Sequence, residues 1–161
     1  MQLEKFWHLI DVAIASEDKE FCLRNALNNL SKTELGEFIE LQGTLETKAN
    51  RWDIWGAAYL IYGDCSDDEF MDFKRELLFL GRNIYEEVID SPDKLVNFDL
   101  KEDIRELGLG YVAQDLYEEK FLEPPSIDES VVCSEMGLRW DFDDYDECLK
   151  RLPNLTRHHW K

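Results

Sequence analysis

The chain has 161 residues, enough for one domain with a buried core, and 44% of them are hydrophobic. Aspartate and glutamate outnumber lysine and arginine by 36 to 18, which gives a formal net charge of −18 at pH 7. Such a surface repels nucleic-acid phosphates and anionic membranes and attracts basic proteins, so nucleic acids and membranes are excluded as expected partners.

The spacing of apolar residues predicts a succession of helices. Near the start, Phe6, Trp7, Ile10 and Ile14 recur at the three- and four-residue spacing of one helical face. In chain order, the predicted helices cover residues 3–15, 19–29, a third segment that opens at residue 31 and includes residue 45, 50–62, 66–80, 82–89, 99–107, 108–121 and 145–152.

Local motifs mark where some of these helices begin and end. Ser31-Lys-Thr-Glu34 and Ser66-Asp-Asp-Glu69 are capping boxes, in which the serine hydroxyl and the glutamate carboxylate each accept a hydrogen bond from a free amide of the first turn. Gly63 is predicted to end the helix 50–62 in the left-handed conformation.

The composition changes after Glu123, where Glu-Pro-Pro-Ser interrupts regular structure. The residues that follow predict an irregular strap with one short strand around 131–133. The sequence therefore predicts a mainly α protein: a compact bundle of six to eight short helices over residues 1–122, with an acidic, irregular C-terminal strap, 123–161, packed on the same domain.

The cysteines and the N-terminus point to a reducing compartment. Cys22, Cys65, Cys133 and Cys148 lie far apart and form no C-x-x-C pair. Charges interrupt each apolar run of the N-terminus, so we expect no signal peptide, and no run approaches the ~18 residues of a membrane helix. We expect a cytoplasmic protein with free thiols.

The run DFDDYDE is the first candidate site. It lacks the glycine and the alternating ligands of a calcium loop, so we expect a surface that binds a basic partner. Aromatic rings stack on guanidinium groups while carboxylates pair with them. The predicted partner-binding residues are Asp141, Phe142, Asp143, Asp144, Tyr145, Asp146 and Glu147.

The stretch RWDIWGAAYLIY is the second candidate. Its Gly-Ala-Ala triplet leaves a notch on the helix, which aromatic side chains surround. One interpretation is a central helix that packs closely against another. The other is a pocket for a small ligand or peptide. The candidate pocket residues are Arg51, Trp52, Asp53, Trp55, Tyr59 and Arg82.

A third candidate is an enzymatic site built from Asp64, Cys65, Asp67 and Asp68 with a divalent metal. A catalytic thiol needs a positive neighbourhood or a histidine partner, whereas these carboxylates raise its pKa. The chain has three histidines and none of the common phosphate-binding, nucleophile or zinc motifs. We therefore expect no catalytic residue, metal ligand or cofactor, and the helix cap explains the same residues.

Several stretches resemble the bacterial family catalogued as domain of unknown function 4240. They are FWHLI, RWDIWGAAYLI, GDCSDDEFMDFK, GRNIYEEVI and GYVAQDLYEEK, and the resemblance runs from about residue 6 to about residue 121. It implies a mainly helical bacterial domain. It transfers no catalytic role, because the family has no established activity.

Three hypotheses of function follow from these observations. The leading one is an acidic cytoplasmic interaction protein, in particular an immunity protein that binds and neutralises a basic toxin such as a nuclease. The first alternative is a regulatory domain that binds a small ligand or peptide in the notch. The second is an enzyme with an acidic, metal-assisted site.

Overall fold

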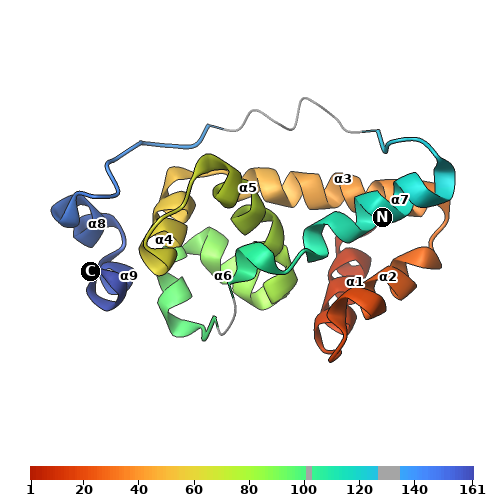
Figure 1. The fold of residues 1–161 in the computed structure, drawn as a ribbon, viewed down its shortest axis with the longest axis horizontal. Coiled ribbons are helices and arrows are strands. Elements are labelled where there is room, and N and C mark those ends of the chain that lie inside the picture. Colours follow the sequence, from red (N-terminus) through yellow and green to blue (C-terminus); the bar gives the residue numbers. More distant parts are fainter. Residues whose placement is uncertain (101–102, 127–134) are drawn as a thin grey trace.

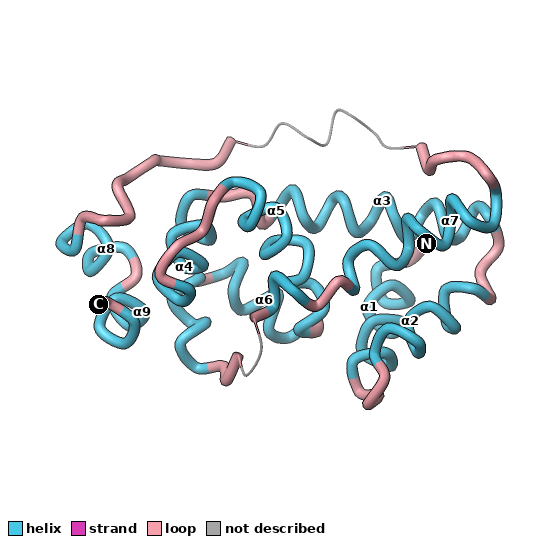
Figure 2. The backbone as a smooth tube through the Cα atoms, in the orientation of Figure 1, coloured by secondary structure: helices cyan, strands magenta, loops and turns pink. Residues whose placement is uncertain are grey.

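The structure, a computed structural model, describes residues 1–100, 103–126 and 135–161 (Figure 1). Figure 2 shows that helices and loops make up this part of the chain, with no strand, so the predicted mainly α fold is confirmed. The α-helices are α1 (Leu3–Ile14), α2 (Lys19–Asn28), α3 (Lys32–Lys48), α4 (Trp52–Tyr62), α5 (Asp67–Glu76), α6 (Arg82–Asp90), α7 (Val112–Phe121), α8 (Tyr145–Arg151) and α9 (Pro153–His159). The 3-10 helices are η1 (Leu77–Leu80), η2 (Pro92–Asn97), η3 (Ile104–Glu106) and η4 (Leu109–Tyr111).

The longest helix, α3, runs along the molecule and is contacted by α7 near one end and by α5 nearer the other (Figure 1). Helices α1 and α2 pack against each other beside α7, whereas α9 packs on α4, α8 and η2 at the opposite end. In Figure 1 the chain leaves α7 at the first of these ends and returns to α8 at the second. None of the helices in the described ranges is both long and apolar enough to cross a bilayer.

The local motifs of the sequence form as predicted. The Ser31 hydroxyl accepts a hydrogen bond from the Glu34 amide at 3.3 Å, and the Glu34 carboxylate accepts one from the Ser31 amide at 3.0 Å. Ser66 and Glu69 make the same pair of bonds at the start of α5. Gly63 ends α4 with a φ of 77°, which is the left-handed region. These contacts fix where the helices begin and end.

Three segments differ from the prediction. Helix α5 ends at Glu76, and the rest of the predicted helix is η1, where Leu77, Leu78 and Phe79 are all buried; an α-helix would turn one of three such neighbours away from the core. In the described part of 99–107, only η3 is helical. The tail after Pro153 forms α9. The strand predicted at 131–133 lies outside the described residues.

The C-terminal arm, defined here as residues 135–161, contributes to the same core as the rest of the chain. Its buried side chains include Trp140, Cys148, Leu152 and Leu155. The arm is also bound through its backbone, because the Met136 carbonyl accepts a hydrogen bond from the Trp52 amide at 2.9 Å. This end of the bundle is therefore complete only when the arm is in place.

A buried carboxylate in η2 fixes the start of α9. Asp93 is 8% exposed and accepts hydrogen bonds from the backbone amides of Asn154 at 3.0 Å and Leu155 at 2.9 Å. It also accepts one from Asn154 Nδ2 at 2.7 Å. A side chain 61 residues away thus takes the place of a local N-cap, and a negative charge at a helix N-terminus is electrostatically favoured.

Candidate functional site

Helix α4 carries the aromatic stretch that the sequence singled out. The rings of Trp52 and Trp55 stack with centroids 5.0 Å apart and an interplanar angle of 2°. The ring of Phe70 from α5 extends the stack, 4.8 Å from the ring of Trp55 and at 7°. The Trp55 indole donates a hydrogen bond to the Cys65 carbonyl at 2.8 Å, which fixes the ring against the loop between the two helices.

The notch beside this stack is filled by the C-terminal arm. A Cβ atom at Gly56 would lie 2.5 Å from the Trp140 ring and 3.1 Å from the Phe142 ring, so only glycine permits this approach. The Phe142 ring also packs 5.4 Å from the ring of Tyr59 and 5.1 Å from that of Trp140. Since the protein's own side chains occupy the notch, it offers no room for a ligand at Gly56, and we do not propose it as a binding pocket.

The charged residues predicted for the rim of that pocket lie in two places. Arg51 forms a two-point contact with Asp53, with nitrogen–oxygen distances of 3.0 and 2.5 Å, and donates to the Ile89 carbonyl at 2.7 Å. Arg82 instead pairs with Glu4 and Glu86, each at 2.7 Å. The structure therefore brings Arg51 and Asp53 together at the start of α4, whereas Arg82, at the start of α6, pairs with α1 and with its own helix.

The acidic run 141–147 lies at the surface, where several of its side chains also order the arm. Asp144 caps α8 by accepting from the Glu147 amide at 3.1 Å, and Glu147 pairs with Arg151 at 3.0 Å. Asp141, Asp143, Asp144 and Asp146 are all exposed. The ring of Phe142 faces inward, so this residue anchors the run rather than presenting a ring to a partner.

Carboxylates from two distant segments meet at Tyr59. Its hydroxyl donates a hydrogen bond to Asp143 at 2.7 Å. This bond, partial burial and the nearby charges of Asp143, Asp64 and Asp141 raise the pKa of Tyr59 to about 12. Asp64 follows α4, whereas Asp141 and Asp143 belong to the arm. We call this surface the acidic face and define it by these residues: Asp64, Asp141, Asp143, Asp144 and Asp146, with the rings of Tyr59 and Tyr145.

An exposed pair of aromatic rings belongs to the same part of the arm. Tyr145, at the start of α8, and Trp160, after α9, are 42% and 37% exposed, and their rings meet edge to face at 5.1 Å. The contact depends on the chain folding back between α8 and α9. The sequence did not indicate that Trp160 contacts Tyr145, because the tail was not predicted to be helical.

The region of the third candidate site is arranged as a helix start. Cys65 is buried, and this burial raises the pKa of its thiol to about 12, so that the thiol stays protonated at neutral pH. Asp67 and Asp68 lie in the first turn of α5, where negative charge is favoured. Within the described ranges, no group of three histidine, cysteine, aspartate or glutamate side chains is arranged to hold a metal ion.

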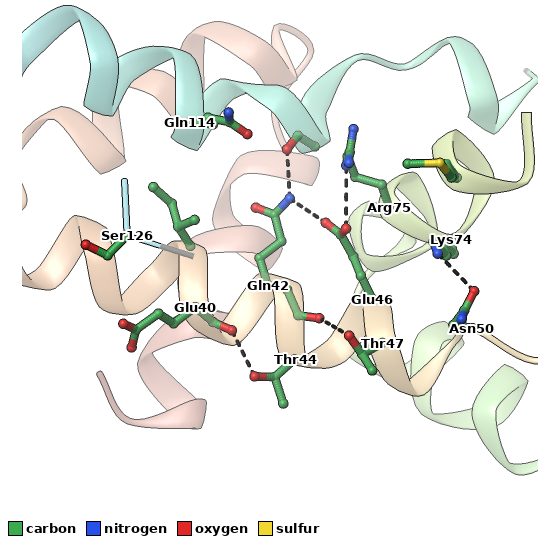
Figure 3. A pocket seen from close by; sticks show the side chains of 14 residues that line it. Glu40, Gln42, Thr44, Glu46, Thr47, Asn50, Lys74, Arg75, Gln114 and Ser126 are labelled. Carbon is green, nitrogen blue, oxygen red and sulfur yellow. Dashed lines mark hydrogen bonds and ion pairs between the residues drawn. The ribbon is translucent and has the colours of Figure 1, made fainter. Parts of the chain in front are cut away.

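The described residues also form a groove that none of the sequence hypotheses included. It has a volume of about 450 Å³ and runs along α3 between that helix, α5 and the start of α7 (Figure 3). Residues that line it include Glu40, Gln42 and Glu46 from α3 and Lys74 and Arg75 from α5. The groove could not be inferred from the sequence, because its walls come from segments that lie far apart in the chain and show ordinary amphipathic patterns.

Most of the chain matches the model of one known protein family. A family model described as "Protein of unknown function (DUF4240)" matches residues 1–119. The chain belongs to this family. The resemblance recognised over residues 6–121 is thus confirmed, and the groove along α3, apart from Ser126, lies in the DUF4240 region. The arm that fills the notch lies outside it. No curated protein and no solved structure is significantly similar to the chain.

Proposed function

We propose that the protein is an interaction protein whose acidic face binds a basic protein partner. The observation that supports the proposal is the meeting at Tyr59 of carboxylates from two segments, Asp64 after α4 and Asp141 and Asp143 in the arm. The face lies on a chain with a net charge of −18, so the field of the whole molecule adds to the local one.

The chemistry of this face suits arginine-rich surfaces. Exposed carboxylates accept hydrogen bonds from guanidinium groups, and such groups can stack on the ring of Tyr145, which the adjacent Trp160 ring extends beyond the face. Attraction between the opposite charges of the two proteins accelerates their association, which is the property that a neutralising partner needs. The form of interaction protein that we favour is a bacterial immunity protein that neutralises a basic toxin, such as a nuclease.

The cysteines support a location in the cytoplasm for this role. Cys22, Cys65 and Cys148 are free, and Cys65 and Cys148 are buried in the core, where burial raises the pKa of both thiols. Thiols of this kind persist in a reducing compartment. A cytoplasmic immunity protein would meet its toxin inside the producing cell.

The test measures binding to an oligoarginine peptide and to the basic protein encoded by any adjacent reading frame. We expect both to bind the full chain, with an affinity that falls as salt is added. The variant Asp141→Asn, Asp143→Asn, Asp146→Asn keeps the hydrogen-bonding oxygens but removes three charges from the acidic face. Its affinity should fall at least ~10-fold, mainly through a slower association rate.

A matched variant separates the acidic face from net charge. Glu17→Gln, Glu20→Gln, Asp115→Asn removes three exposed charges near the opposite end of the molecule, around α2 and α7. It should bind within ~2-fold of the unmodified chain, since charges beyond a Debye length are screened. Equal losses of affinity in the two variants, or an affinity that neither variant changes, would contradict the proposal that the acidic face is the binding site.

A further inference from the structure

The groove along α3 has an end lined by two cations. Lys74 is half-buried, and this burial lowers the pKa of its ammonium group. Its Nζ donates to Asn50 Oδ1 at 3.0 Å, and no carboxylate of the described residues lies within ion-pair distance of it. Beside it, the Arg75 guanidinium lies 4.3 Å from the Tyr111 ring centre, and its Nε is 3.5 Å from Glu46. Glu46 offsets one of the two cations, so this end carries one net positive charge, which can accept an anionic group.

A buried amide faces the middle of the groove. Gln42 is 6% exposed, and its Nε2 donates to Glu46 Oε1 at 2.8 Å and to the Gly110 carbonyl at 2.7 Å. Because both partners are acceptors, they fix the amide orientation, and the oxygen points away from them along the groove (Figure 3). No donor of the described residues bonds to that oxygen. A ligand N–H in the groove would satisfy it.

The other end of the groove is acidic. Glu40 is exposed, and its carboxylate forms no ion pair among the described residues. Asn50, the partner of Lys74 at the cationic end, follows Glu40 by ten positions and lies just after α3. At 1.5 Å per helical residue, the two residues are about 15 Å apart along the groove. An extended peptide of about four residues spans a similar length. A zwitterion also carries no net charge, so the field of the −18 chain does not repel it.

We propose that this groove binds a short linear peptide of about four residues through its free C-terminal carboxylate. The carboxylate lies between Lys74 and Arg75, a backbone N–H donates to Gln42 Oε1, and the terminal ammonium group lies toward Glu40. Ile39 and Met71 supply apolar wall for the peptide side chains. This site is separate from the acidic face, so the two proposals can fail independently.

The experiment titrates tetra-alanine with free termini, and its C-terminally amidated form, into the full chain by calorimetry. We expect the amidated peptide to bind at least ~10-fold more weakly, because it lacks the anionic group. Lys74→Met keeps most of the side-chain volume and should reduce the affinity for the free peptide to that for the amidated one. Lys48→Met removes the same charge from α3 outside the groove and should leave binding unchanged.

Two further measurements test whether the peptide binds in the groove and whether a simple anion can replace it. The side-chain amide resonances of Gln42 and Gln114 should shift when the free peptide is added, whereas those of Asn83, which is on α6, should not. Inorganic phosphate should not displace the peptide at equal concentration. The proposal is overturned by equal binding of the two peptides, by no binding of either at about 10 mM, by displacement with phosphate, or by equal losses in Lys74→Met and Lys48→Met.

Discussion

Glu76 is the most deeply buried carboxyl group among the described residues, with 1% of its surface exposed. Its two oxygens accept hydrogen bonds from the backbone amides of Leu109 at 3.1 Å and Gly110 at 2.9 Å. Burial outweighs these bonds and raises the pKa of Glu76 to about 7. The side chain thus joins α5 to η4, beside the groove, at the cost of making stability depend on pH.

The sign of this dependence follows from proton binding. Between the ordinary pKa of 4.5 and about 7, folded Glu76 holds a proton that the unfolded chain releases. Stability contributed by the protonated form is therefore complete below pH 4.5 and is lost as the pH rises to about 7. The shift corresponds to a loss of up to about 3 kcal/mol in the free energy of unfolding.

This prediction is checked by comparing the stability of the unmodified chain with that of Glu76→Gln, whose side chain does not titrate. Urea unfolding of both proteins should show the unmodified chain losing stability relative to the variant as the pH rises from ~4.5 to ~8. The variant itself loses one amide contact, which lowers its stability by the same amount at each pH. A difference between the two proteins that stays constant over this range would refute the assigned pKa.

The start of helix α9 depends on a side chain that is distant in the sequence. Asp93→Ala leaves the amides of Asn154 and Leu155 without their acceptor. We expect the free energy of unfolding to fall by about 2 kcal/mol, because buried donors lose a charge-assisted partner. Hydrogen exchange should show faster exchange in α9 and at the end of α8, with little change in α1 and α2.

A nearby residue supplies the control for this prediction. Asp90→Ala also removes a carboxylate that precedes the arm, but Asp90 is exposed and, among the described residues, its one ion pair is with Lys94 at 2.8 Å. Exposed pairs of this kind contribute less than about 1 kcal/mol. If the two substitutions had equal effects on exchange in α9, Asp93 would not be the cap of that helix.

The elements that the sequence predicted well are those whose signals are local. The bonds of Ser31 with Glu34 and of Ser66 with Glu69 span three residues, and Gly63 needs only its own backbone conformation. The start of α9 depends on Asp93, and the filling of the notch brings Trp140 against Gly56. Such contacts join residues 61 and 84 positions apart, and no pattern within a short window encodes them.

The candidate sites also combine features that are local in the sequence with contacts that only the fold creates. The acidic run was visible in the sequence as a cluster of like charges, but its meeting with Asp64 at Tyr59 required the fold. The groove was invisible because Gln42 and Lys74 look like ordinary members of amphipathic helices. What makes them important is, for Gln42, an amide oxygen that no donor among the described residues reaches and, for Lys74, the half-burial of its ammonium group.

For the whole molecule, the net charge of −18 predicts a specific response to salt. Repulsion among the acidic side chains opposes the compact state, and added salt screens it. Salt also weakens the ion pairs, but those between two exposed side chains, such as Lys5 with Glu34, Lys32 with Glu123 and Lys94 with Asp90, contribute little each. We therefore expect the urea midpoint to rise between ~0.01 and ~0.3 M sodium chloride, by on the order of 1 kcal/mol in stability.

A charge-reversal variant provides the check on this interpretation. Glu17→Lys, Glu20→Lys changes two exposed side chains and reduces the net negative charge by four units. The stabilisation by salt should be smaller in this variant than in the unmodified chain. A midpoint that falls with salt would mean that the ion pairs outweigh the repulsion.

The aromatic notch on α4 also bears on the order of events during synthesis. Gly56 and the stacked tryptophans leave the ribosome long before Trp140 and Phe142, which complete that part of the core. Domains fold as their residues emerge, so the nascent protein passes through a stage with an uncovered cluster of rings. A polypeptide that stopped short of residue 140 would keep this cluster uncovered, in the form that chaperones and proteases recognise. The arm would then distinguish finished molecules from incomplete ones.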